Sequence, residues 1–86
     1  MEIKPAVIAL AALAQETRLA IFRLLIEAGP EGVSAGRIGE TLEIPGATLS
    51  FHLKELSRAG LISSRQQKQF IYYATDFEAM AELMNK

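Results

Sequence analysis

The stretch ATLSFHLKELSRAGLI, residues 47–62, decides the fold of this chain. At 100° per residue, one set of its side chains falls within a narrow arc, as the core-facing stripe of an amphipathic helix does: Leu49, Leu53, Leu56 and Gly60. Pro45-Gly46 breaks the chain just before this pattern, and Gly60 ends it. The stretch therefore predicts a helix from about Gly46 to Ala59.

The flanking residues predict further elements by their apolar period and their start and stop signals. Ser34 and Asp76 are suitable N-caps, and residues 61–75 contain the β-branched and aromatic residues that are typical of strands. The expected elements are helices from Pro5 to about Leu13, from Glu16 to Ala28 and from Ser34 to Leu42, strands 61–66 and 70–75 joined around 67–69, and a last helix after Asp76.

Two short helices joined by EIPG (43–46) match the spacing of a helix-turn-helix, although any αα-hairpin gives a similar pattern. The hairpin directly after the second of these helices strengthens the match. We therefore expect one domain over residues 1–86, mainly α with a small β-hairpin: a winged helix-turn-helix in the order helix, helix, helix, helix, strand, strand, helix.

The face opposite the core stripe predicts what the 46–59 helix contacts. It carries Ala47, Thr48, Ser50, Phe51, Lys54 and Arg58. Hydroxyl groups there suit bases or phosphates, the two cations suit the DNA backbone, and Phe51 suits a thymine methyl group in the major groove. The alternative for Phe51 is a contact with a partner protein or a partly buried core position.

His52 lies about 60° from the centre of the core stripe. Two interpretations stay open for this single histidine. Either it contacts phosphate or a base edge at the margin of the DNA, or it is a boundary residue hydrogen-bonded to a nearby backbone group. A metal role is disfavoured because zinc needs several ligands.

The charges support nucleic acid as the partner. The chain as a whole has a net charge of −1, yet residues 46–73 carry four basic residues and one acidic residue. Two of these basic residues, Arg65 and Lys68, lie in the predicted hairpin and are expected to contact phosphates. Residues 1–45 and 74–86 are net acidic. The segregation predicts a basic helix-plus-hairpin unit within an acidic protein.

Composition excludes several classes of protein and suggests a dimer. Without cysteine, and with one histidine, the chain offers no thiolate site, no disulfide and no credible catalytic set, so we expect neither an enzyme nor a bound cofactor or metal. Half of the residues are hydrophobic, more than so small a domain needs for its own core. We expect the excess to form a two-fold interface from both ends of the chain: Val7, Leu10, Ala14, Phe77, Met80 and Met84.

Residues 5–14 contain no polar side chain. They are too few to span a bilayer, which takes about 20 residues. A signal peptide is the sharper alternative, but the run is rich in alanine and continues into the next helix without a break. A buried helix in a soluble, cytoplasmic protein is the better interpretation.

The segments LAQETRLAIFRLL (13–25) and IPGATLSFHLKELSRAGLI (44–62), followed by a Tyr-Tyr strand, resemble the ArsR family of bacterial winged-helix repressors over nearly the whole chain. The resemblance implies a homodimer, joined by its first and last helices, that binds a palindromic operator and releases it when an inducer binds. It also places Ser50 and His52 in the DNA-reading helix. The subgroup that the chain resembles most is associated with arsenical resistance.

The chain also departs from the family. It lacks the cysteines that some members carry in the helix matching SAGRIGETL (34–42), and it offers no histidine after residue 52. The resemblance therefore leaves the inducer unidentified and supplies no thiolate sensor. The alternative function is a winged-helix module for protein–protein contact that binds no operator.

Overall fold

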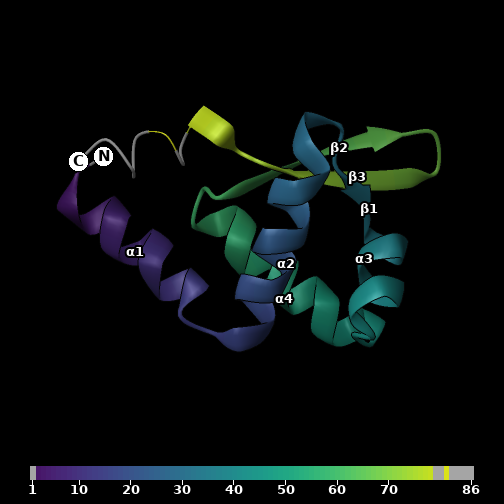
Figure 1. Cartoon of the computed structure of the whole chain (residues 1–86), viewed down its shortest axis with the longest axis horizontal. Coiled ribbons are helices and arrows are strands. Elements are labelled where there is room, and N and C mark those ends of the chain that lie inside the picture. The colour runs from purple at the N-terminus through teal and green to yellow at the C-terminus, as the bar shows by residue number, and fades with distance from the viewer. Residues whose placement is uncertain (1, 79–80, 82–86) are drawn as a thin grey trace.

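The computed structural model describes residues 2–78 and residue 81. Figure 1 shows α2 and α4 side by side at the centre, with the sheet along one edge and α1 to one side. The elements are α1 (Ile3–Leu13), α2 (Glu16–Ala28), the short 3-10 helix η1 (Gly29–Glu31), β1 (Val33–Ser34), α3 (Ala35–Leu42), α4 (Gly46–Arg58), β2 (Ile62–Gln67) and β3 (Phe70–Thr75).

The expected winged helix-turn-helix is confirmed, with small changes at element ends. α1 begins at Ile3, not at Pro5, and the first hairpin strand runs one residue later than predicted. The predicted last helix is described only in part: Phe77, Glu78 and Ala81 are helical. Met80 and Met84 lie outside the described residues.

The sheet contains one more strand than the sequence predicted. Its antiparallel strands have the order β1-β3-β2, with Val33 opposite Tyr73 and Arg65 opposite Tyr72. The hairpin turn consists of residues 68 and 69, and Lys68 takes a positive φ of 59° where glycine or asparagine is usual. The third strand ties the hairpin to the residue that caps α3.

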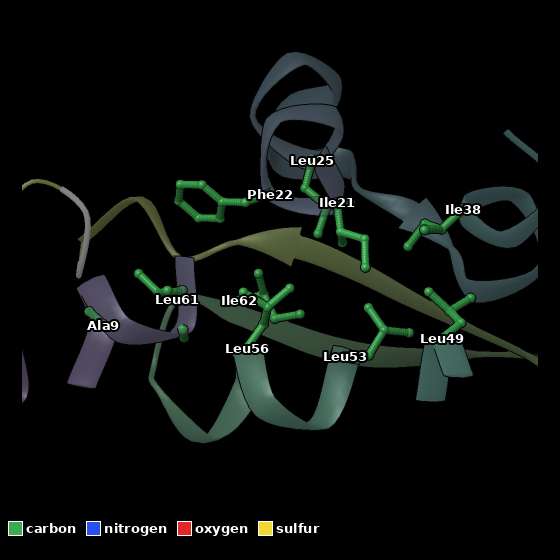
Figure 2. Close-up of a cluster of buried hydrophobic side chains, with 11 residues drawn as sticks. Ala9, Ile21, Phe22, Leu25, Ile38, Leu49, Leu53, Leu56, Leu61 and Ile62 are labelled. Carbon is green, nitrogen blue, oxygen red and sulfur yellow. The ribbon is translucent and has the colours of Figure 1, made fainter. Parts of the chain in front are cut away.

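The core lies between α2, α4 and the sheet. Figure 2 shows side chains of α2 and α4 pointing toward one another, with those of the chain entering β2 beside them. The predicted stripe of α4 is confirmed, since Leu49, Leu53 and Leu56 are all buried. The cluster comprises Ala9, Ala12, Ile21, Phe22, Leu25, Ile38, Leu49, Leu53, Leu56, Leu61 and Ile62.

α1 contributes only its small side chains to this core. Ala9 and Ala12 are buried, whereas Ile3, Val7, Ile8 and Leu10 are each more than half exposed. In the described part of the chain no single helix is long and apolar enough to cross a membrane. The sharply bent pair formed by α1 and residues 16–31 passes that test of length and composition jointly.

Candidate nucleic-acid interface

α4 is set by signals at both of its ends. Pro45 precedes it in extended conformation, and the Leu49 amide donates to the Pro45 carbonyl at 2.8 Å. At the other end Gly60, with φ +79°, allows two closing bonds: its own amide to Ser57 O and that of Leu61 to Leu56 O. This Schellman arrangement needs a left-handed residue, which glycine adopts without steric cost. It turns the chain from α4 directly into the wing.

The face of α4 that points away from the core carries the side chains expected to meet DNA. Ala47, Thr48, Ser50, Phe51, Lys54 and Arg58 are all exposed. Phe51 is 56% exposed, which rules out a core position for it. Its ring meets the His52 ring edge-on, with centroids 5.5 Å apart. A large apolar ring is thus held on the outer surface of a short helix.

The four cations expected to contact DNA differ in the contacts that they make within the protein. The ammonium groups of Lys54 and Lys68 make no hydrogen bond or ion pair with any residue that the structure describes. Arg58 forms an exposed ion pair with Glu55 at 3.5 Å, which is worth little in water and is easily exchanged for a phosphate. The Arg65 guanidinium lies 5.2 Å from the centre of the Tyr72 ring and donates to the Glu31 carbonyl at 2.8 Å. Arg65 therefore braces the wing against η1.

A groove of about 540 Å³ lies between α3, α4 and β3 of the wing. Ser50 and Leu53 line it from α4, and Ile71 and Tyr73 from β3. The structure thus brings Ser50 to the side of α4 that adjoins the wing. Thr48 lines a different hollow, beside the turn between α3 and α4.

His52 lies at the core edge as predicted, but its surroundings were not foreseen. It is 8% exposed, and its Nδ1 lies 3.3 Å from a terminal nitrogen of Arg18. Because an arginine can only donate, this hydrogen bond requires Nδ1 to accept, and it therefore favours the neutral imidazole. Burial, and then the Arg18 charge, lower the pKa of His52 below its ordinary value of 6.5. The partner is a side chain 34 residues away, not a nearby backbone group.

Arg18 is the residue that sequence reasoning missed. It precedes Ile21, Phe22 and Leu25 by three, four and seven positions, so it belongs to the buried stripe of α2. A charged residue on such a stripe is the signal that could have revealed it, since a charge that is partly removed from water needs hydrogen-bond partners.

The residues expected at a dimer interface are exposed where the structure describes them. Val7 and Leu10 are 57% and 55% exposed, Phe77 is 37% exposed, and Ala14 is exposed as well. Among the described residues no three His, Cys, Asp or Glu side chains are grouped to hold a metal ion.

Comparison with known proteins agrees with this arrangement. The family described as helix-turn-helix domain matches residues 13–65. The transcriptional activator HlyU of Vibrio cholerae is 36% identical in an alignment of 84 residues that covers 94% of this chain and 75% of that protein. A solved structure of Vibrio cholerae HlyU superposes with a TM-score of 0.80 at 33% identity, covering 99% of this chain and 92% of that one.

A second solved structure carries the family name. It is the homodimeric winged helix-turn-helix DNA-binding domain of Mb0332 from Mycobacterium bovis, described as a possible ArsR-family regulator. It superposes with a TM-score of 0.83 at 25% identity, over 96% of this chain and 74% of that one. The chain belongs to the ArsR family of winged helix-turn-helix transcriptional regulators. In this ArsR-family protein α3 and α4 form the helix-turn-helix, and β2 and β3 form the wing.

Proposed function

We propose that this protein is a homodimeric, sequence-specific DNA-binding regulator that inserts α4 into the major groove of a palindromic operator. The observation that carries the proposal is the composition of the outer face of α4. Thr48, Ser50 and Phe51 are exposed there beside Lys54, a cation without a described partner. Hydroxyls and an aromatic ring can read base edges and thymine methyl groups, while the ammonium binds phosphate.

The wing supplies the second contact. Lys68 at its tip is free to bind phosphate, whereas Arg65 would have to leave Tyr72 and Glu31 to do so. We therefore assign phosphate binding to Lys54, Lys68 and Arg58 before Arg65. His52, which is buried against Arg18, is assigned to support of the helix, with a DNA contact through its other ring nitrogen as the competing assignment.

The dimer is proposed from the apolar surface of α1. A protein of this size does not leave four large apolar side chains of one helix exposed without a partner surface. Two-fold pairing through α1 and the last helix would bury them and present two copies of α4 to two half-sites. The Mycobacterium bovis neighbour is a homodimer, which supports this pairing.

The family resemblance implies repression, whereas the relative from Vibrio cholerae is named an activator. Operator binding is the step that both kinds of regulator share, and it is what we propose. The protein would act in the cytoplasm as a binding protein without catalytic activity.

Selection of bound duplexes from a random DNA pool tests the proposal. We expect an enriched palindrome whose half-sites lie about one helical turn apart. Replacing Lys54 by alanine should weaken binding to all duplexes alike and lower the salt slope by about one unit per lost phosphate contact. Arg23→Ala is the matched control, because Arg23 is an exposed cation on α2, without a described partner and away from α4.

Enrichment of no sequence, together with retention on heparin that salt does not weaken, would contradict operator binding. That result would favour the alternative, a winged-helix module for contact with another protein. Sedimentation of a monomer at micromolar concentration would contradict the dimer.

A further inference from the structure

Arg18 is a charged side chain on the core-facing stripe of α2. Ile21, Phe22 and Leu25, which continue that stripe, are all at most 6% exposed. Arg18 lies in the first turn of α2. The Gln15 side chain accepts a hydrogen bond from the Arg18 backbone amide at 2.8 Å, which fixes this turn. Arg18 is half-buried, and its guanidinium lies between α2 and its neighbours, where the donors that are taken out of water need acceptors.

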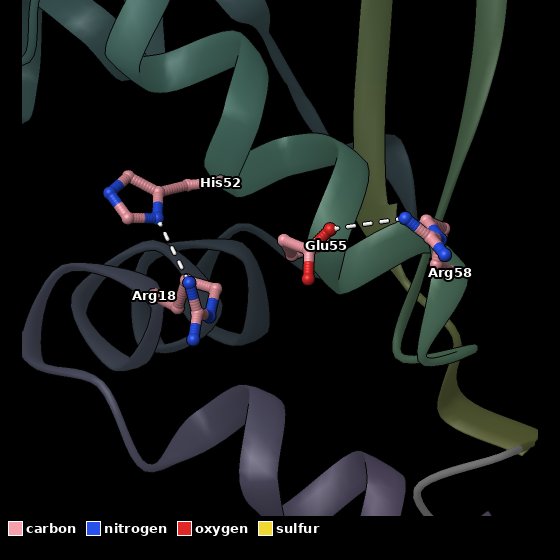
Figure 3. Close-up of polar contacts among 4 residues, drawn as sticks. All are labelled: Arg18, His52, Glu55 and Arg58. Atoms are coloured by element: carbon pink, nitrogen blue, oxygen red, sulfur yellow. Dashed lines mark hydrogen bonds and ion pairs between the residues drawn. The ribbon is translucent and has the colours of Figure 1, made fainter.

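The Arg18 guanidinium donates hydrogen bonds to acceptors on two different helices. Nε donates to the Ala12 carbonyl at 2.7 Å, and a terminal nitrogen donates to His52 Nδ1 at 3.3 Å, the contact drawn in Figure 3. Ala12 lies in the last turn of α1, whose carbonyls have no partner within the helix. The Arg18 cation is also stabilised by the negative, C-terminal end of the α1 helix dipole. Arg18 thus joins the end of α1 to the middle of α4.

Other charged groups near this junction are accounted for. A hollow of about 400 Å³ between α1 and α4 is lined by Ile8 and Ala11 on one side and by Glu55 and Arg58 on the other. Glu55 pairs with Arg58, as Figure 3 shows, so the carboxylate lining this hollow has a partner, in an ion pair that is exposed and weak. Ala12 and Arg18 line the same hollow, and α1 also touches α4 directly, so the polar link through Arg18 adds to those contacts in fixing the relative placement of the two helices.

We propose that Arg18 is a positioning residue for DNA binding, which sets α4 relative to α1 through its paired hydrogen bonds to His52 and the Ala12 carbonyl. The proposal rests on the proposed function. If α1 forms the two-fold interface, the angle between α1 and α4 determines the spacing of the two recognition helices in the dimer. Operator half-sites have a fixed spacing, so an error in that angle lowers affinity without loss of any DNA contact.

The first experiment follows the only histidine of the chain by NMR during a pH titration. Arg18→Met removes the donor and the charge, so the His52 pKa should rise and its Nδ1 resonance should shift. Arg23→Met is the matched control, with the same chemical change on an exposed part of α2, and it should leave both signals unchanged. An unaltered His52 titration in the Arg18 variant would overturn the proposal.

The second experiment measures affinity for a duplex that the wild-type protein selects from a random pool. Arg18→Met should lower that affinity about tenfold, the scale of one charge-assisted hydrogen bond, with an unchanged salt slope because no phosphate contact is lost. Circular dichroism and sedimentation confirm that the variant is a folded dimer. If it does not fold, Arg18→Lys replaces it, since a single ammonium cannot bridge both acceptors as a guanidinium does.

Variants of His52, alone and combined with Arg18→Met, separate a positioning role of Arg18 from a direct contact of His52 with DNA. His52→Gln keeps a neutral acceptor and should retain affinity, while the double variant with Arg18→Met should bind no more weakly than Arg18→Met alone. A loss of affinity in His52→Gln with none in Arg18→Met would overturn the proposal and place His52 on the DNA. An altered His52 titration with unaltered affinity would overturn the positioning role alone. Failure of the wild-type protein to select any duplex would overturn operator binding, and the positioning role with it. The titration would still report separately whether Arg18 contacts His52.

Discussion

Phe51 and His52 are neighbours in the sequence and lie in opposite environments. Phe51 is 56% exposed and His52 is 8% exposed. The angle of 100° per residue is enough to predict this contrast, because it places Phe51 opposite the leucine stripe and His52 at its edge. It could not predict Arg18 as the partner of His52, since that contact joins residues 34 apart and depends on how α2 packs against α4.

Because Phe51 is exposed, replacing it should change DNA binding without changing the stability of the fold. Phe51→Ala should leave the free energy of unfolding within about 0.5 kcal/mol of the wild type, as is usual for surface positions. It should weaken binding to the selected duplex, and the loss should be smaller on a duplex in which the contacted thymine methyl group has been replaced by hydrogen. Leu53→Ala, two positions along, should instead cost about 2–5 kcal/mol in denaturant unfolding, because Leu53 is buried in the core. Equal stability losses in the two variants would contradict the assigned faces of α4.

The His52 pKa makes stability depend on pH in a definite direction. Folding lowers this pKa below 6.5, chiefly through burial, so the folded state favours the neutral ring. The unfolded chain takes up a proton first as the pH falls, and stability present above pH 6.5 is lost as the pH drops toward the lowered folded-state value. Denaturant midpoints measured across this range should fall for the wild type more than for His52→Gln. Parallel curves for the two proteins would contradict the assignment.

At the scale of elements, the sequence predicts the helices better than the wing. α2 has the predicted bounds, because Gly29-Pro30 ends a clear apolar period, and Ser34 caps α3 through the Arg37 amide as expected. β1 was not predicted, because two residues are too few to show an alternating pattern. Its pairing with β3 depends on Gly32, whose φ is +78° and where an added Cβ would clash with the Tyr73 carbonyl oxygen.

Gly32 and Gly29 form a matched pair for testing that strand. Both have φ +78°, but a Cβ at Gly29 would meet nothing within 4 Å. Gly29→Ala should therefore cost about 1–3 kcal/mol from backbone strain alone, because φ 78° with ψ −164° is a conformation that essentially only glycine adopts. Gly32→Ala should cost about 1–3 kcal/mol more, because β1 must also move away from β3. Thermal unfolding of the two variants measures the difference. Equal destabilisation would mean that the pairing of β1 with β3 tolerates the added methyl group.

For the whole molecule, composition indicates the dimer but not its geometry. An apolar content of 50% predicts a surface that needs a partner, and the structure locates much of that surface on α1.

Leu10, half exposed in one chain, would be present twice in a two-fold interface. Burying one leucine side chain contributes about 1.5–3 kcal/mol, so Leu10→Asp should raise the dimer dissociation constant at least about a hundredfold. Leu19→Asp is the control, because Leu19 is an exposed leucine on α2 outside the proposed interface. Sedimentation at micromolar concentration should find a monomer for Leu10→Asp alone, and that monomer should lose operator binding, since one half-site supplies too few contacts. A dimer that survives the charge at Leu10, or a monomer that binds the full operator as well as the wild type, would contradict this interface.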